Sequence, residues 1–241
     1  GATSFNQDIS QWDVSSVESG EFSGMENMFN NTALSPTNYD RILVGWATRD
    51  LEDGLSLTAE GTEYCNSDPS RTHLIEAFGW NIDDAGQQSG CPETLEADEA
   101  KQIGGDGTFD FGDVATSLTF SGITGSGRIT LARYSNGPRN VEGISEDNVS
   151  QYRLVAAGGG ITSFDSADIR FAVSEFSGIS QPEDVTVYRR SRPGHGTFGP
   201  LPTSVDDNGT PDDISDDTLS ATVTDTTGAG GFGEFVFASD T

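Results

Sequence analysis

The sequence predicts a mixed fold, in which a short N-terminal part made of helix–strand units precedes an all-β sandwich of jelly-roll type. Three observations lead to this prediction. Glycine accounts for 30 of the 241 residues, and Leu and Lys are scarce, which is typical of turn-rich β proteins. Helical periodicity is confined to residues 1–92, and short alternating or apolar runs separated by turn residues fill the rest of the chain.

Two helices are predicted in residues 1–92. Ser35-Pro36 supplies an N-cap and a proline at the first helical position, and a helical apolar face follows it. That face consists of Tyr39, Ile42, Leu43 and Trp46. Ser67-Asp68-Pro69 repeats the start signal, and Gly79 is a good left-handed stop. Because a short apolar strand is expected after each helix, at 55–57 and 80–82, this part reads as stacked supersecondary units.

A change of composition near residue 92 indicates a domain boundary. Residues 1–92 carry 15 acidic and 3 basic side chains, and the remainder carries 24 and 9. Residues 93–107 are acidic and then glycine-rich, so we expect a linker there, between a domain at 1–92 and a β domain at 108–241. Eight strands are expected in the β domain, at 108–114, 117–120, 128–134, 151–156, 169–176, 185–190, 218–224 and 232–237.

Residues 5–17 read FNQDISQWDVSSV, and residues 22–29 read FSGMENMF. These motifs resemble one unit of the BspA-like leucine-rich repeats of bacterial surface proteins, and residues 34–91 resemble the closing module of that family. The resemblance implies a capped solenoid with further repeats upstream, since a repeat buries its apolar face only against neighbours. Ile9, Trp12, Val14 and Val17 would line its strand. The β domain resembles C-terminal domains of exported Bacteroidetes-type proteins, which implies an extracellular or cell-surface location.

Cys65 and Cys91 are the two cysteines of the chain. Taken alone, they fit a disulfide, two buried free thiols or part of a metal site, although neither histidine completes a recognisable zinc spacing with them. The exported character of the composition favours the disulfide. The resemblance to the closing module implies that these two cysteines are bonded to each other.

The formal net charge of -27 limits the classes of partner. Nucleic acids and anionic membranes attract Lys and Arg, so neither is expected to bind this chain. No run of 18 apolar residues occurs, and no membrane insertion is expected in this segment. High salt or bound calcium would relieve the self-repulsion of so acidic a chain, which suggests a salt-rich (halophilic) habitat or a calcium site. The alternative is an ordinary acidic secreted protein.

Six aspartates lie within residues 206–217, in the sequence DDNGTPDDISDD. Hard cations prefer several oxygen ligands, and a glycine-containing loop lets carboxylates converge. Calcium is therefore the predicted cofactor, with the ligands Asp206, Asn208, Asp212 and Asp216. The spacing departs from an EF-hand, and a solvated acidic hairpin loop is the alternative.

Arg189, Arg190 and Arg192 form the one basic cluster and are candidates for binding an acidic glycan or a partner domain. Internal salt bridges are the alternative for these arginines. Trp12, Trp46 and Trp80 are the aromatic residues that could stack on sugars, but all three match positions that the repeat family buries.

The sequence offers little for catalysis, because it contains neither G-x-S-x-G nor HExxH. The predicted function is non-catalytic: adhesion of a secreted or cell-surface bacterial protein to a protein or glycan ligand. Self-association as a subunit of an extracellular filament or surface layer is the second candidate. A glycan-active enzyme that uses two of the many carboxylates comes third.

Overall fold

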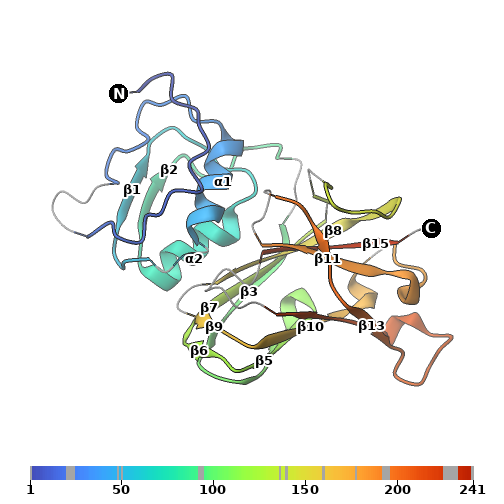
Figure 1. Ribbon diagram of the computed structural model, residues 1–241. Helices are drawn as coiled ribbons and strands as arrows, with labels where there is room; N and C mark the ends of the chain where they lie inside the picture. Colours follow the sequence, from blue (N-terminus) through green and yellow to red (C-terminus); the bar gives the residue numbers. More distant parts are fainter. Residues whose placement is uncertain are drawn as a thin grey trace.

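The computed structural model describes residues 2–19, 25–47, 49, 51–91, 95–135, 137–138, 141–158, 161–176, 178–191, 196–224 and 233–239. An N-terminal unit, residues 2–91, carries both of the α-helices in these ranges, and two larger sheets follow it (Figure 1). None of the helices among the described residues is long and apolar enough to span a membrane.

The N-terminal unit confirms the two predicted helices and the strands after them. Helix α1 covers Pro36–Ala47 and α2 covers Asp68–Phe78, where Gly79 ends the helix at a φ of 64°. Strands β1 (Ser56–Ala59) and β2 (Asn81–Asp84) pair in parallel. A parallel pair needs a crossover, and α2 provides it, so this unit is one β–α–β element preceded by α1.

The opening segment differs from the expected solenoid strand. Residues 2–19 contain turns and no strand within the described range, so a leucine-rich solenoid is not seen. Ile9 and Val14 are buried as expected, but Trp12 is 56% exposed. The Trp12 backbone N–H donates to the Ile9 carbonyl in a tight turn, so Trp12 does not continue the alternation that an extended strand would give.

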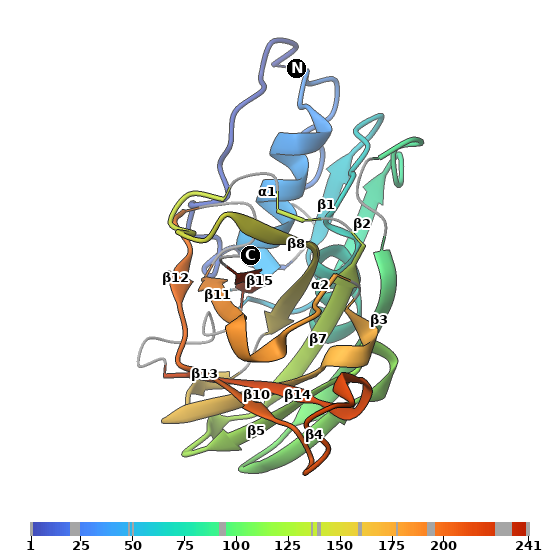
Figure 2. The same cartoon turned by 90° about the vertical axis from the view of Figure 1, so that its right-hand side faces the viewer.

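The β domain is a sandwich of two antiparallel sheets, as far as the described residues show (Figure 2). The five-stranded sheet has the order β13-β14-β10-β5-β4, and the six-stranded sheet has the order β12-β11-β15-β8-β7-β3. The bounds in the first sheet are β4 Gly107–Phe111, β5 Thr116–Ser121, β10 Ser166–Ala172, β13 Thr203–Asp206 and β14 Thr218–Val223. Those in the second are β3 Leu95–Ile103, β7 Gly127–Tyr134, β8 Asn148–Gly158, β11 Thr186–Arg190, β12 Gly199–Pro200 and β15 Gly233–Ser239. The eight predicted strands correspond to β4, β5, β7, β8, β10, β11, β14 and β15, which confirms the sandwich.

Short elements complete the sandwich. Strands β6 (Thr124–Gly125) and β9 (Ile161–Ser163) pair with each other. Single 3₁₀ turns lie at η1 Gly112–Val114, η2 Val173–Glu175, η3 Pro182–Asp184 and η4 Ile214–Asp216. The core between the two sheets is rich in phenylalanine, and the rings of Phe171, Phe176 and Phe237 pack against one another with centroids 4.6–6.3 Å apart.

The predicted linker is wrong for most of its length. Residues 95–103 form β3, an edge strand that pairs with β7 along its whole length. Its charged residues suggested a solvated connection, but charge is also common on edge strands, because it opposes pairing with another chain. Ile103 is fully buried in the sandwich core and fixes one end of the strand.

Helix α2 packs against β7 and β8, on the outer side of the six-stranded sheet. The Tyr134 hydroxyl on β7 donates to the Asn66 carbonyl just before the helix, at 3.0 Å. Arg128, also on β7, forms an ion pair with Glu76 on the helix. The two units are therefore joined through side chains and not only through the chain connection.

His73 lies on α2 and is fully buried. Neither ring nitrogen has a hydrogen-bond partner among the described residues, and the ring meets Phe78 edge-on at 5.6 Å. Burial, and then the nearby Arg128 charge, lower the pKa of His73 to about 4. The folded protein thus holds His73 neutral.

This depressed pKa predicts a loss of stability in mild acid. His73 of the unfolded chain takes up a proton near pH ~6.5, whereas His73 of the folded chain does so only near pH 4. Protonation therefore favours the unfolded chain, and the free energy of unfolding falls as the pH drops below ~6.5. Urea unfolding of the wild type should lose about 2 kcal/mol more than His73→Leu between pH 7 and pH 5. Parallel pH curves for the two proteins would contradict the prediction.

Candidate functional site

Cys65 and Cys91 form a disulfide, which confirms the predicted pair. It closes a loop that contains β2 and α2, and their Cα atoms are 5.5 Å apart. Both cysteines are thereby accounted for by a structural bond. The alternatives of free thiols and of a cysteine metal site are not what the structure shows.

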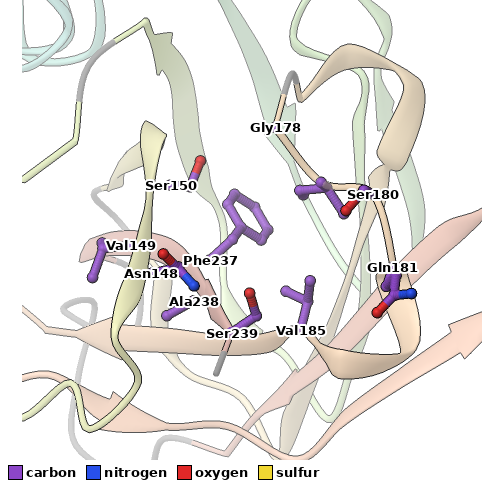
Figure 3. Close-up of a pocket in the computed structure, with 11 residues that line it drawn as sticks. Asn148, Val149, Ser150, Gly178, Ser180, Gln181, Val185, Phe237, Ala238 and Ser239 are labelled. Atoms are coloured by element: carbon purple, nitrogen blue, oxygen red, sulfur yellow. The ribbon is translucent and has the colours of Figure 1, made fainter. Parts of the chain in front are cut away.

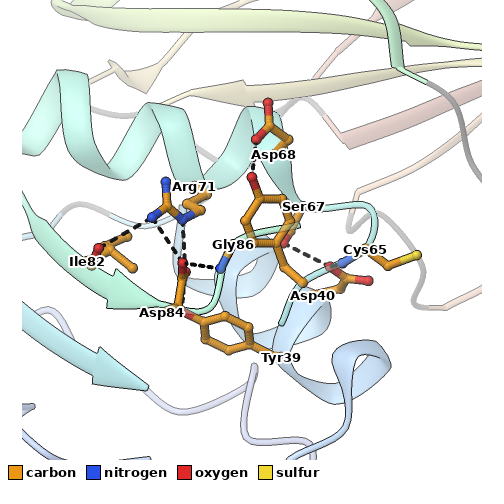
Figure 4. A network of polar contacts seen from close by, with 10 residues as sticks. Tyr39, Asp40, Cys65, Ser67, Asp68, Arg71, Ile82, Asp84 and Gly86 are labelled. Carbon is orange, nitrogen blue, oxygen red and sulfur yellow. Dashed lines mark hydrogen bonds and ion pairs between the residues drawn. The ribbon is translucent and has the colours of Figure 1, made fainter. Parts of the chain in front are cut away.

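Two buried carboxylates organise the N-terminal unit around this disulfide (Figure 4). The Asp40 carboxylate accepts hydrogen bonds from the Cys65 and Asn66 backbone N–H groups and from the Ser67 hydroxyl, at 2.8–2.9 Å. The Asp84 carboxylate accepts from the Tyr39 hydroxyl and from the Arg71 guanidinium, with the shortest contact at 2.8 Å.

Burial and the Asp84 charge raise the pKa of Tyr39, so its phenol stays protonated and donates. Carboxylates that already accept several donors suit a structural role better than acid–base catalysis. This cluster holds the N-terminal unit together, and we assign no chemistry to it.

The acidic loop is held by hydrogen bonds between its own residues. The Asn208 backbone N–H donates to the Asp206 carboxylate at 3.2 Å, and the Thr210 hydroxyl donates to the Asp216 carboxylate at 2.9 Å. Asp212 is exposed on the same loop. Within the described residues, no group of three or more Asp, Glu, His or Cys side chains is placed to hold a metal. The structure thus connects Asp206, Asn208 and Asp216 through one turn but does not assemble a ligand shell.

Asp217, which was not among the predicted ligands, is the unusual carboxylate of this region. It is buried, and no donor in the described part of the chain reaches its Oδ1 atom. Burial raises its pKa, and the negative charges of Asp216 and Asp207 add to the effect. A carboxylate in this environment is the one that a cation would stabilise most.

The arginine cluster does not form one binding surface. Consecutive residues of a strand point to opposite faces, so Arg189 and Arg190 on β11 are separated by the sheet. Arg190 is buried and forms an ion pair with Glu234 on β15, as the alternative of internal salt bridges predicts. Its guanidinium group is therefore not placed to contact an external ligand. Arg192 lies outside the described residues.

Two of the three tryptophans are buried, and the third is not. Trp46 and Trp80 belong to the core of the N-terminal unit, as expected. The exposure of Trp12 overturns its expected burial and leaves it as the largest exposed apolar side chain among the described residues. One exposed ring does not define a binding site, and nothing in the structure gives it a ligand.

A pocket of about 350 Å³ lies at one end of the sandwich (Figure 3). Its walls come from the first residues of β8, the last residues of β15, the turn between η2 and η3, and Val185 just before β11. The polar side chains that line it are Asn148, Ser150, Ser180, Gln181 and Ser239. Its apolar lining includes Ile179, Val185 and Phe237. In the described part of the chain, no side chain with an ionisable group lines this pocket.

Sequence reasoning missed the pocket because its residues come from segments far apart in the chain and form no motif. One signal was present. The inward-facing residues of β8 change from Leu154 and Tyr152, which pack on the core, to Ser150 and Asn148. Such a switch marks the point where the interior of a sandwich opens to water.

Comparisons with known proteins found no family model, no curated protein and no solved structure that matches this chain.

Proposed function

We propose that the chain is a non-catalytic contact protein of the extracellular space or the bacterial cell surface, which adheres to a protein or glycan ligand. The observation that carries this proposal is the pocket at the end of the sandwich. General acid–base and nucleophilic catalysis need ionisable or activated groups, whereas the pocket offers hydroxyls, amides and an apolar floor. Those groups are suited to holding a ligand and not to transforming it.

The location and the repeat relationship are parts of the same proposal. The Cys65–Cys91 disulfide supports an oxidising compartment, because such bonds are rare where thiols are kept reduced. The burial of Ile9, Val14 and Phe29 in one core supports kinship with the BspA-like repeats.

The experiment is binding of the labelled chain to immobilised glycans and matrix proteins, with heat-denatured chain as the control. We expect saturable retention of the folded monomer and no turnover of the retained ligand. Polymerisation of the purified protein in electron micrographs, without saturable retention, would instead support the filament or surface-layer role. Release of reducing ends from a glycan would support the enzyme.

We also propose that the acidic loop binds calcium, and Asp217 supports this because its buried Oδ1 atom has no hydrogen-bond donor among the described residues, and burial together with nearby carboxylates raises its pKa. At 100-fold excess over Kd, calcium should raise the Tm of EDTA-stripped protein by about 5–10 °C at constant ionic strength. Asp217→Asn should reduce that rise, and Asp53→Asn, at an exposed site in the N-terminal unit, should leave it unchanged. An unchanged Tm for the wild type would rule the site out.

A further inference from the structure

The pocket combines an apolar floor with an uncharged polar rim. Figure 3 shows the Phe237 ring between Ser150 and Ser180, with Val185 and Ser239 below it. Phe237 belongs to the sandwich core, where its ring packs against Phe176 at 4.6 Å, so the floor is held in place. The rim residues Asn148, Ser180 and Gln181 are exposed and present amide and hydroxyl groups that both donate and accept.

The charge of the molecule restricts the ligand to a neutral one. With a net charge of -27, the chain repels anions as they approach. Metal cations bind most tightly where carboxylate, imidazole or thiolate groups replace part of their hydration shell, and the described lining contains none of these groups. A molecule with many hydroxyls and no charge meets neither obstacle.

The position of the pocket within the sheet argues against a peptide strand as the ligand. Peptides often bind by pairing with an open sheet edge. Strand β15 runs through the middle of the pocket wall, and there Ala238 pairs with Thr186 of β11 on one side and with Val149 of β8 on the other. The β15 residues of the pocket therefore offer no open edge to a peptide, and we expect recognition through the side chains at the strand ends, in a volume at the lower end of the usual range of about 300–1,000 Å³.

We propose that this pocket binds a neutral pyranose unit of a glycan, and this inference rests on the proposed contact function. The carbon–hydrogen face of the sugar ring packs on the partly exposed apolar side chains of the pocket, Val149 and Ile179, above the buried Phe237 ring, which removes apolar surface from water. Its hydroxyls exchange hydrogen bonds with the rim, in which Gln181 supplies both a donor and an acceptor.

The test is titration of the isotope-labelled full chain with methyl glycosides of neutral hexoses, at about 10 mM to reach weak binding. Amide signals of Ser150, Gly178 and Ser180 and the side-chain amide of Gln181 should shift in a saturable way. Glucuronic acid and glucosamine, which carry a charge, should shift them less. Gln181→Ala should weaken binding about 3- to 10-fold, as expected for one lost hydrogen bond.

Two further variants keep the result interpretable. Gln88→Ala, at an exposed glutamine of the N-terminal unit, is the matched control and should bind as the wild type does. Ser180→Phe places a bulky ring at the rim and should abolish the shifts while leaving the unfolding curve unchanged, because residue 180 is exposed.

The inference is overturned if no neutral glycoside shifts the pocket amides, or if a neutral peptide shifts them and the glycosides do not. Its failure is distinguishable from failure of the proposed function. A chain that adheres to an immobilised protein but ignores glycosides keeps the contact function and loses the sugar site. A chain that binds glycosides at the pocket but is retained on no surface keeps the site and loses the adhesion.

Discussion

Replacing Glu234 with alanine is expected to lower the free energy of unfolding by about 3–5 kcal/mol, because it leaves buried positive charge without this carboxylate. The Glu234 carboxylate pairs with Arg190 of β11 and with Arg153 of β8, at 2.5 and 3.5 Å. All three side chains are at most 5% exposed. The arginines also lie over aromatic rings, Arg190 over Phe198 and Arg153 over Tyr134, so the cluster crosses the outer face of the sheet.

Urea unfolding of Glu234→Ala measures this effect, and a second ion pair supplies the control. Glu76 and Arg128 are 45% and 35% exposed, so Glu76→Ala should cost less than about 1 kcal/mol. The double variant Glu234→Met/Arg190→Met should recover part of the loss, since it replaces one buried ion pair with apolar side chains and leaves only Arg153 without the Glu234 carboxylate. A cost for Glu234→Ala as small as that for Glu76→Ala would show that the buried cluster is not held by its charges.

Loss of the Cys65–Cys91 disulfide is expected to lower the free energy of unfolding by about 3.5 kcal/mol. The bond spans 26 residues, and the figure is the loop-closure entropy that the unfolded chain regains over that span. The measurement is urea unfolding of the wild type with and without reductant.

The double variant Cys65→Ser/Cys91→Ser is the control, and reductant should not change its unfolding midpoint. Amide exchange should accelerate in α2 and β2, which lie inside the closed loop, more than in the sandwich. Equal midpoints for oxidised and reduced wild type would contradict the prediction.

The regular elements could be predicted because their signals are local. Pro36 and Gly79 mark helix ends through their backbone conformations. Apolar and polar residues alternate along β5 and β14 because one face of each strand is buried and the other is more exposed. Strand β3 was not predicted because its register depends on β7, which lies beyond three intervening strands in the chain. The exposure of Trp12 was not predicted because a turn, and not a strand, sets the direction of its side chain.

The candidate sites were less predictable, because they depend on side chains brought together by the fold. The pocket joins residues near 148, 180 and 238, which share no spacing in the chain. Asp217 looks like its five neighbouring aspartates in the sequence, and burial alone sets it apart. The disulfide could be anticipated, because the exported character of the composition favoured it and the resemblance to the closing module implied it.

The disulfide also determines how the chain would respond to a pulling force. When the chain is drawn out from its two ends, tension passes from Cys65 to Cys91 through the sulfur atoms and bypasses the residues between them. Those residues, 66–90, include α2 and β2, and their extended length of about 90 Å stays unavailable until the bond is reduced. The oxidised chain is therefore shorter at full extension than the reduced chain, so the redox state of the Cys65–Cys91 bond sets the maximum length to which the chain can be stretched.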